Sequence, residues 1–124
     1  MKEIKTTNAP AAIGPYSQAI EVNGMLFASG QLPVDPATGE MPATIEAQAE
    51  QSLKNVGGIL KEAGPDYKNV VKTTCFLANI ADFAKFNEVY AKYFSADPKP
   101  ARSCVAVKDI PKGALCEVEV LAVK

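Results

Sequence analysis

The chain has 124 residues, of which 13 are basic, 14 are acidic and none is histidine, so its net charge is −1. This length predicts one domain, residues 1–124, with a hydrophobic core of its own. The charge provides no basic face for a phosphate backbone, so nucleic acid is not expected as a partner. The lack of imidazole excludes histidine-based triads and histidine metal sites.

The cysteines and the first residues indicate where the protein works. Cys75, Cys104 and Cys116 are odd in number and widely spaced, with no C-x-x-C pair. This pattern favours free thiols in a reducing compartment. The first ten residues contain no apolar signal region, and no apolar stretch approaches the roughly 20 residues that span a membrane. We therefore expect a cytoplasmic protein without a membrane partner.

A short leading segment is followed by a predicted β-hairpin. Asn23-Gly24 lies between two apolar-rich runs, residues 16–22 and 25–30. It is the strongest sequence signal for a type I′ turn, because both central residues need a positive φ. The resulting register gathers four polar side chains at one end of one face, where they form either a solvated sheet end or the floor of a site: Tyr16, Gln18, Ser29 and Gln31.

The first predicted helix begins after a turn-rich loop, residues 33–43. Thr44 is a suitable N-cap, and Gly64-Pro65 ends the helix. Apolar residues recur at spacings of three and four and form one stripe: Ala49, Leu53, Val56, Leu60 and Ala63. Gly57-Gly58 weakens the helix by about 1 kcal/mol per glycine. Close packing against a sheet and tolerance on the solvent side both remain open for this pair.

A strand and a second helix are predicted next. Residues 70–78 are rich in β-branched side chains, and residues 80–94 carry an apolar helical face with Asn79 as N-cap. Asn87 falls on that apolar face. A buried amide without partners costs about 1–3 kcal/mol. We therefore expect Asn87 to bond to backbone, to another chain or to a ligand.

Residues 101–107 and 115–123 predict the last two strands. Even positions of the final strand are all apolar, whereas the odd positions mix leucine and valine with Glu117 and Glu119. A face of this kind is not typical of solvent exposure, which favours helices on one side of the sheet and another subunit on the other. The order β-β-β-α-β-α-β-β predicts an α+β two-layer sandwich.

Arg102 is the only arginine, because the other 12 basic residues are all lysine. A guanidinium presents a planar fork that grips a carboxylate or phosphate through two parallel hydrogen bonds, which lysine cannot do. The alternative interpretation is a structural ion pair.

Glu117 is the best candidate for a general base, because burial in an apolar strand face raises the pKa of a carboxyl group. Its alternative role is an ion pair with a lysine across a subunit surface. Metal binding by Glu117 and Glu119 is weakly signalled, since no third ligand is in view. Cys104 shares a strand face with Arg102, which is compatible with an activated thiol, although a lone buried cysteine usually acts as a small hydrophobe.

Four segments together resemble the RidA (YjgF) family over essentially the whole chain. They are AAIGPYSQA at residues 11–19, ASGQLP at 28–33, PARSCV at 100–105 and CEVE at 116–119. The resemblance implies a chorismate-mutase-like subunit and a homotrimer with ligand sites between subunits. It also implies hydrolytic deamination of 2-imino acids and enamines, such as 2-iminobutanoate and 2-iminopropanoate. No cofactor or metal is expected, because an imine carbon is already electrophilic.

The resemblance also assigns roles to single residues. Arg102 matches the carboxylate-binding arginine, and Glu117 matches the glutamate that positions or activates water. Four further positions match pocket residues of the family: Tyr16, Ser29, Asn87 and Cys104. Other functions remain open at this point: a small-carboxylate or 2-oxo acid sensor without turnover, an endoribonuclease or translation inhibitor, and a protein-binding or chaperone-like role.

Overall fold

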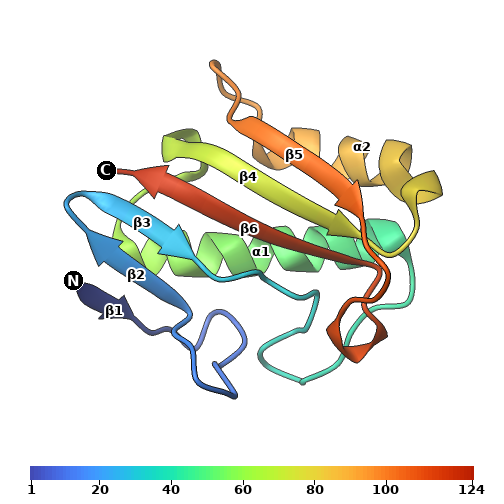
Figure 1. Cartoon of the computed structure of the whole chain (residues 1–124), viewed down its shortest axis with the longest axis horizontal. Coiled ribbons are helices and arrows are strands. Elements are labelled where there is room, and N and C mark those ends of the chain that lie inside the picture. The colour runs from blue at the N-terminus through green and yellow to red at the C-terminus, as the bar shows by residue number, and fades with distance from the viewer.

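The computed structural model describes residues 1–124 as one six-stranded sheet with two helices. The elements along the chain, drawn in Figure 1, are β1 (Lys2–Ile4), β2 (Ala19–Val22), β3 (Met25–Ala28), α1 (Ile45–Ala63), β4 (Val70–Leu77), α2 (Phe83–Tyr93), β5 (Ala101–Ala106) and β6 (Cys116–Val123). Three short 3-10 helices join them: η1 (Tyr67–Asn69), η2 (Ile80–Asp82) and η3 (Pro111–Gly113). The predicted order of strands and helices is confirmed.

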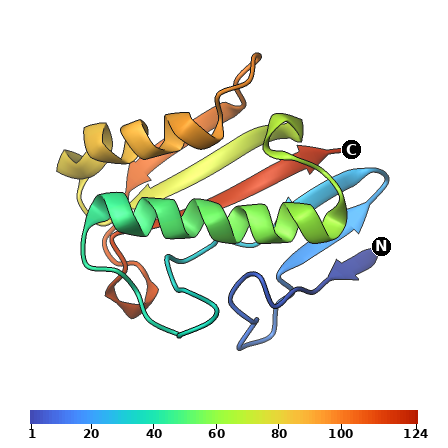
Figure 2. The same ribbon diagram turned by 180° about the vertical axis from the view of Figure 1, so that it is seen from behind.

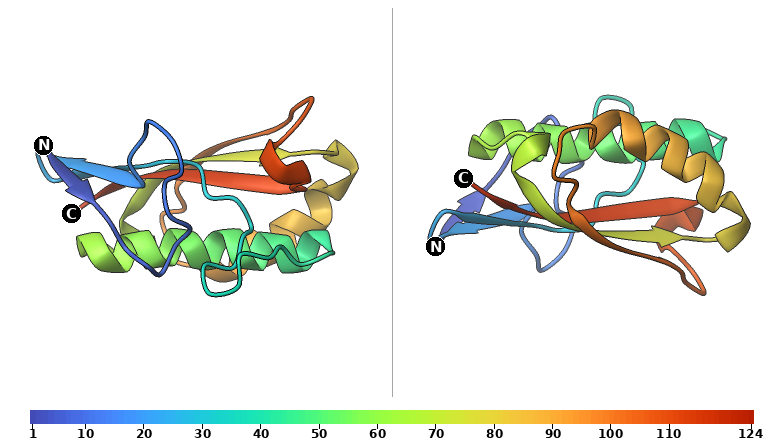
Figure 3. Two further views of the ribbon diagram at one scale, coloured as in Figure 1. Left: turned by 90° about the horizontal axis from the view of Figure 1, so that it is seen from below. Right: turned by 90° about the horizontal axis from the view of Figure 1, so that it is seen from above.

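The sheet has the strand order β1-β2-β3-β6-β4-β5. Neighbouring strands are antiparallel except for β4 and β5, which are parallel and are connected through α2. Both helices lie on the same face of the sheet (Figures 2 and 3). The predicted α+β two-layer sandwich is therefore confirmed, and the second face of the sheet is left without a covering layer in the single chain.

The core lies between α1 and the even-numbered side of β6. The predicted stripe on α1 is fully buried, as are Cys116, Val118, Val120 and Ala122. Thr44 caps α1 by accepting a hydrogen bond from the Ala47 N–H at 3.2 Å. Burial of a leucine or valine side chain stabilises a fold by about 1.5–3 kcal/mol. The helix is therefore held by this stripe more than by its own propensity.

Gly57 and Gly58 pack against other parts of the chain. A Cβ atom on Gly57 would collide with the hydroxyl group of Tyr67, and one on Gly58 would collide with the backbone carbonyl of Asn8. The Tyr67 hydroxyl donates a hydrogen bond to the Leu53 carbonyl at 2.6 Å. Close packing is therefore the reason for this pair, but the packing partners are η1 and the N-terminal segment and not the sheet.

The hairpin has the predicted turn. Asn23 and Gly24 have φ values of 52° and 76°, and Val22 faces Met25. The strands are shorter than predicted, because the chain leaves β3 after Ala28 and Gln31 then forms a bridge with Val118 of β6. The register set by the turn also predicts Tyr16 opposite Gln31, but the β2–β3 ladder ends at the pair Ala19 and Ala28, so this pair does not form.

Gln18 has a structural role. Its side chain is 5% exposed and accepts a hydrogen bond from the Thr6 N–H at 2.8 Å. Its amide group donates to the carbonyls of Thr6 at 3.0 Å, Ala9 at 3.3 Å and Pro10 at 2.8 Å. These bonds tie the N-terminal segment to the start of β2. Three members of the predicted polar cluster, Tyr16, Gln18 and Gln31, line one small pocket, whereas the Ser29 hydroxyl bonds to the backbone of Ser17.

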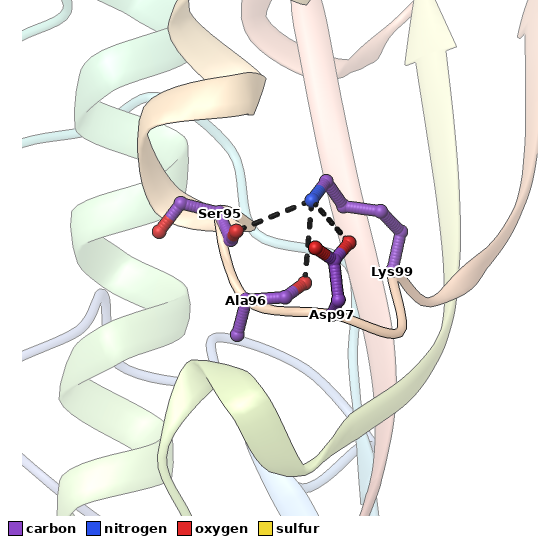
Figure 4. Close-up of polar contacts among 4 residues, drawn as sticks. All are labelled: Ser95, Ala96, Asp97 and Lys99. Atoms are coloured by element: carbon purple, nitrogen blue, oxygen red, sulfur yellow. Dashed lines mark hydrogen bonds and ion pairs between the residues drawn. The ribbon is translucent and has the colours of Figure 1, made fainter.

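Lys99 bridges the loop that follows α2. Its ammonium group donates to the carbonyls of Ser95 at 3.2 Å and Ala96 at 3.4 Å, and it pairs with Asp97 Oδ1 at 2.8 Å (Figure 4). These acceptors belong to the loop, because α2 ends at Tyr93 and is capped by Phe94. The contact shapes the loop that leads directly into β5, the strand that carries Arg102.

The helix-free face of the sheet exposes several apolar side chains. Phe27 is 42% exposed, Val105 is 45% exposed and Val123 is 40% exposed. Leu121 and Phe76 are half-buried neighbours on this face. Neither α1 nor α2 has the length and apolar character that a membrane-spanning helix needs.

Candidate active site

Arg102 lies at the outer edge of the sheet, on β5, between aromatic side chains of α2. Its guanidinium carbon is 4.7 Å from the ring centroid of Tyr90 and 5.4 Å from that of Phe83. Its Nη1 donates a hydrogen bond of 2.6 Å to Asn87 Oδ1. The strand places it there because β5 returns parallel to β4 directly after α2, so that β5 and α2 are neighbours.

No carboxylate of the chain pairs with Arg102. The ion pairs of the structure all use lysine: Lys5–Glu3, Lys99–Asp97 and Lys124–Glu21. Within one chain, Arg102 is therefore not half of a structural ion pair. A half-buried guanidinium that rests on aromatic rings and lacks a counter-ion is suited to receive an anion.

Asn87 has a hydrogen-bond partner, as expected for an amide on an apolar helix face. That partner is the side chain of Arg102, which differs from the backbone, second chain or ligand expected from the sequence. The contact joins α2 to β5, and helical periodicity does not predict contacts with a residue on another element. The amide uses one of the five N–H groups of the guanidinium.

Cys104 follows Arg102 on the same strand face, opposite Cys75 of β4. Its side chain is half-buried. Burial raises the pKa of the Cys104 thiol, and the nearby Arg102 opposes this only in part. The thiol is therefore protonated at neutral pH, which disfavours a nucleophilic role.

Glu117 lies on the helix-free face of β6 and is half-buried. Burial raises the pKa of its carboxyl group, and the charge of Glu119 on the same face raises it further. Gly30 presses against this carboxylate, since a Cβ atom on Gly30 would lie 2.7 Å from Glu117 Oε2. The sequence segment Ser29-Gly30-Gln31 was too generic to single out Gly30, and the bridge of Gln31 to β6 is the feature that gives the glycine its role.

Tyr16 and Ser29 lie near Gly30. Tyr16 is 52% exposed and lines a small pocket of about 40 Å³ together with Gly30 and four neighbouring residues. The Ser29 hydroxyl donates to the Ser17 carbonyl at 2.6 Å. We call Tyr16, Ser29, Gly30 and Glu117 the glutamate cluster, and we call Asn87, Arg102 and Cys104 the arginine cluster.

Arg102 and Glu117 lie on opposite faces of the sheet. Arg102 pairs with Thr73 in register, and Thr73 also pairs with Val120, so these three side chains share the face that the helices cover. Glu117 pairs with Phe76 and points to the other face. One chain therefore does not bring Arg102 and Glu117 together. Cysteine, aspartate and glutamate side chains nowhere gather in threes that could hold a metal ion.

The fold and the site define a class of small α+β proteins in which a solitary arginine at the sheet edge rests on aromatic rings of the second helix. The family model described as endoribonuclease L-PSP, the YjgF/RidA family, matches residues 6–124. The chain belongs to this family.

Individual relatives carry different names. A Lactococcus lactis protein named as a candidate regulator, AldR, is 54% identical over 98% of this chain and 97% of its own length. The 2-iminobutanoate/2-iminopropanoate deaminase of Escherichia coli K12 is 48% identical over 99% of this chain and 98% of its own length. E. coli TdcF, whose crystal structure holds bound serine, is 44% identical in sequence to this chain. The two structures superpose with a TM-score of 0.95 over 100% of this chain and 99% of the TdcF chain.

Proposed function

We propose that this chain hydrolyses reactive 2-imino acids, 2-iminobutanoate and 2-iminopropanoate among them, to 2-oxo acids and ammonia. The observation that carries the proposal is Arg102, a half-buried guanidinium that rests on aromatic rings and has no carboxylate partner in the chain. Support also comes from the deaminase of E. coli, which is 48% identical, and from TdcF, whose structure holds an amino acid.

Arg102 binds the substrate carboxylate. Asn87 occupies one N–H of Nη1, and the remaining N–H groups are available for a bidentate contact. Because Asn87 and the Tyr90 ring both hold the guanidinium, little side-chain freedom is lost when the substrate binds. The carboxylate is thereby fixed with its imine carbon at a defined distance from the arginine.

A second copy of the chain supplies the other half of the site. Arg102 and Glu117 lie on opposite faces of the sheet, and the helix-free face exposes Phe27, Val105 and Val123. In the proposed homotrimer these apolar side chains are buried between copies, and Arg102 of one copy faces Glu117 of its neighbour. An apolar face without a covering layer supports this assembly.

Glu117 activates the water. Its carboxylate takes a proton as the water oxygen attacks C2 of the imino acid, and the electrons of the C=N bond move to nitrogen. Glu117 returns that proton to the nitrogen, which gives a carbinolamine with a hydroxyl and an amino group on C2. Glu117 then takes the hydroxyl proton and passes it to the amino group as the C–N bond breaks, so that the carbonyl of the 2-oxo acid forms and ammonia leaves. A base of raised pKa is suited to both steps near neutral pH. Tyr16, Ser29 and Asn87 shape the pocket, and Cys104 lines it. An imine carbon is already electrophilic, so the reaction needs orientation and proton transfer only.

A carboxylate-binding module without turnover is the second candidate. It is favoured by the serine in the TdcF structure and by the regulator name of the L. lactis relative. An endoribonuclease, the activity in the family description, is disfavoured by the net charge of −1 and the absence of histidine.

The deciding experiment generates the imine in the assay and follows release of the 2-oxo acid and ammonia. We expect turnover by the wild type and a loss of about tenfold to a hundredfold in kcat/KM for Arg102→Lys, which keeps the charge but not the fork. Lys54→Ala is the matched control, because it removes an exposed charge from the middle of α1. Binding of serine or a 2-oxo acid without any imine hydrolysis would favour the binding module. RNA cleavage that survives Arg102→Ala would lie outside this site.

A further inference from the structure

A buried pair of hydroxyl groups lies directly behind Arg102. Thr73 of β4 is fully buried, and its Oγ1 lies 2.8 Å from the Tyr90 hydroxyl oxygen. Tyr90 belongs to α2 and is 8% exposed. Thr73 is also the residue that pairs in register with Arg102 across the parallel strands. The pair therefore links β4, α2 and the position of the arginine on β5.

Tyr90 is the aromatic residue closest to the guanidinium. The Arg102 carbon lies 4.7 Å from its ring centroid, against 5.4 Å for Phe83. Attraction between a cation and a ring depends on this distance and on the tilt of the ring, and it strengthens when the pair is shielded from water. Phe86 and Phe94 pack against the other parts of the Tyr90 ring, with centroid distances of 6.0 Å and 4.6 Å. The hydrogen bond to Thr73 fixes the remaining end of the ring.

We propose that Thr73 and Tyr90 are positioning residues for the carboxylate-binding arginine: their hydroxyl–hydroxyl bond fixes the Tyr90 ring as a platform that sets the plane of the Arg102 guanidinium. This inference rests on the proposed function. Neither hydroxyl touches the substrate. Asn87 restrains one edge of the guanidinium from α2, and the platform restrains its plane, so that both restraints together orient the free N–H groups toward one carboxylate position.

The double variant separates two possible roles of the Thr73–Tyr90 bond, a contribution to stability alone and the positioning of Arg102. Two buried hydroxyls that satisfy each other avoid the penalty of an unpaired polar group, and either single variant, Thr73→Val or Tyr90→Phe, leaves its partner unpaired. The double variant removes both hydroxyls together and leaves no orphan. It is therefore expected to recover most of the melting temperature that the single variants lose, while the platform stays unrestrained.

The experiment uses the fact that the chain has only one arginine. Its Nε–H gives a unique signal in the ¹H–¹⁵N spectrum of the full assembly, and that signal reports the order of the guanidinium without any substrate. We expect the double variant to lower the order parameter of this signal and to raise KM for 2-iminobutanoate about three- to tenfold, with kcat nearly unchanged. Tyr67→Phe is the matched control, because it removes another tyrosine hydroxyl bond, to the Leu53 carbonyl on α1.

The outcomes are distinguishable. An arginine signal that keeps its order in the double variant overturns the inference, whether or not the chain is a deaminase. An arginine that loosens while KM stays at the wild-type value also overturns it, because the platform would then not serve binding. Failure of the wild type to hydrolyse any imine refutes the proposed function alone, and the arginine signal still decides whether Thr73 and Tyr90 hold the guanidinium.

Discussion

Two inactive variants are expected to restore activity to each other when they are assembled together. Arg102→Ala damages the arginine cluster, and Glu117→Gln damages the glutamate cluster. The two residues lie on opposite faces of one sheet, so each proposed site takes Arg102 from one copy and Glu117 from its neighbour. A mixed assembly therefore contains some sites in which both contributing residues are intact.

The size of the recovery follows from counting. In a random one-to-one mixture, half of the arginine donors and half of the glutamate donors are intact, so about one quarter of the sites recover, whatever the number of copies in a closed ring. Co-expression of the two variants with different affinity tags gives the mixture for the imine assay. Selection of the mixed assemblies removes those built from one variant alone, so about one third of the sites are expected to recover in the selected homotrimers.

A matched mixture shows what the absence of restoration looks like. Arg102 and Asn87 are hydrogen-bonded within one chain, so co-assembly of Arg102→Ala with Asn87→Ala leaves activity at the mean of the two parents. If the Arg102→Ala and Glu117→Gln mixture also stays at the mean of its parents, the site is not shared between copies and the proposed assembly is wrong.

The other predictions concern the glutamate cluster and the thiol. Gly30→Ala places a methyl group 2.7 Å from the Glu117 carboxylate. We expect kcat to fall by roughly a hundredfold with an unchanged melting temperature. An unchanged kcat would show that this contact does not position Glu117 for catalysis. Glu119→Gln removes the charge that raises the pKa of Glu117, so the base ionises at lower pH and the acid limb of the pH–rate profile moves to lower pH; a limb that stays in place would contradict the role of either glutamate. Cys104→Ser is expected to retain most of the activity, because the raised pKa keeps the thiol protonated, and an inactive variant would revive the thiol as nucleophile.

Local sequence signals predicted the elements well because their causes are local. Asn23-Gly24 forms a turn that needs two positive φ values, and Thr44 and Gly64 mark the ends of α1. The length of the hairpin strands was overestimated because the departure of the chain after Ala28 depends on pairing with β6, a strand almost 90 residues further along the chain. Contacts between distant segments do not appear in periodicity.

In the candidate site too, local features could be predicted from the sequence, whereas contacts between distant segments could not. Helical periodicity predicted that Asn87 needs a partner, but the partner is Arg102 on another element. In β5 both faces mix polar and apolar side chains, so the sequence did not tell which face meets the helices. The register with Thr73 and the contacts with α2 assign Arg102 to the covered face and separate it from Glu117. The role of Gly30 is not visible in the sequence, because it depends on the Glu117 side chain that the bridge of Gln31 to β6 brings against it.

The separation of Arg102 and Glu117 on the two faces of the sheet has a genetic consequence. In the proposed assembly every copy lends its arginine to one site and its glutamate to a neighbouring one. A copy that lacks both side chains but still assembles would disable two sites at once. An allele of this kind would therefore act dominantly over the wild type in the same cell, whereas an allele that prevents folding would be recessive.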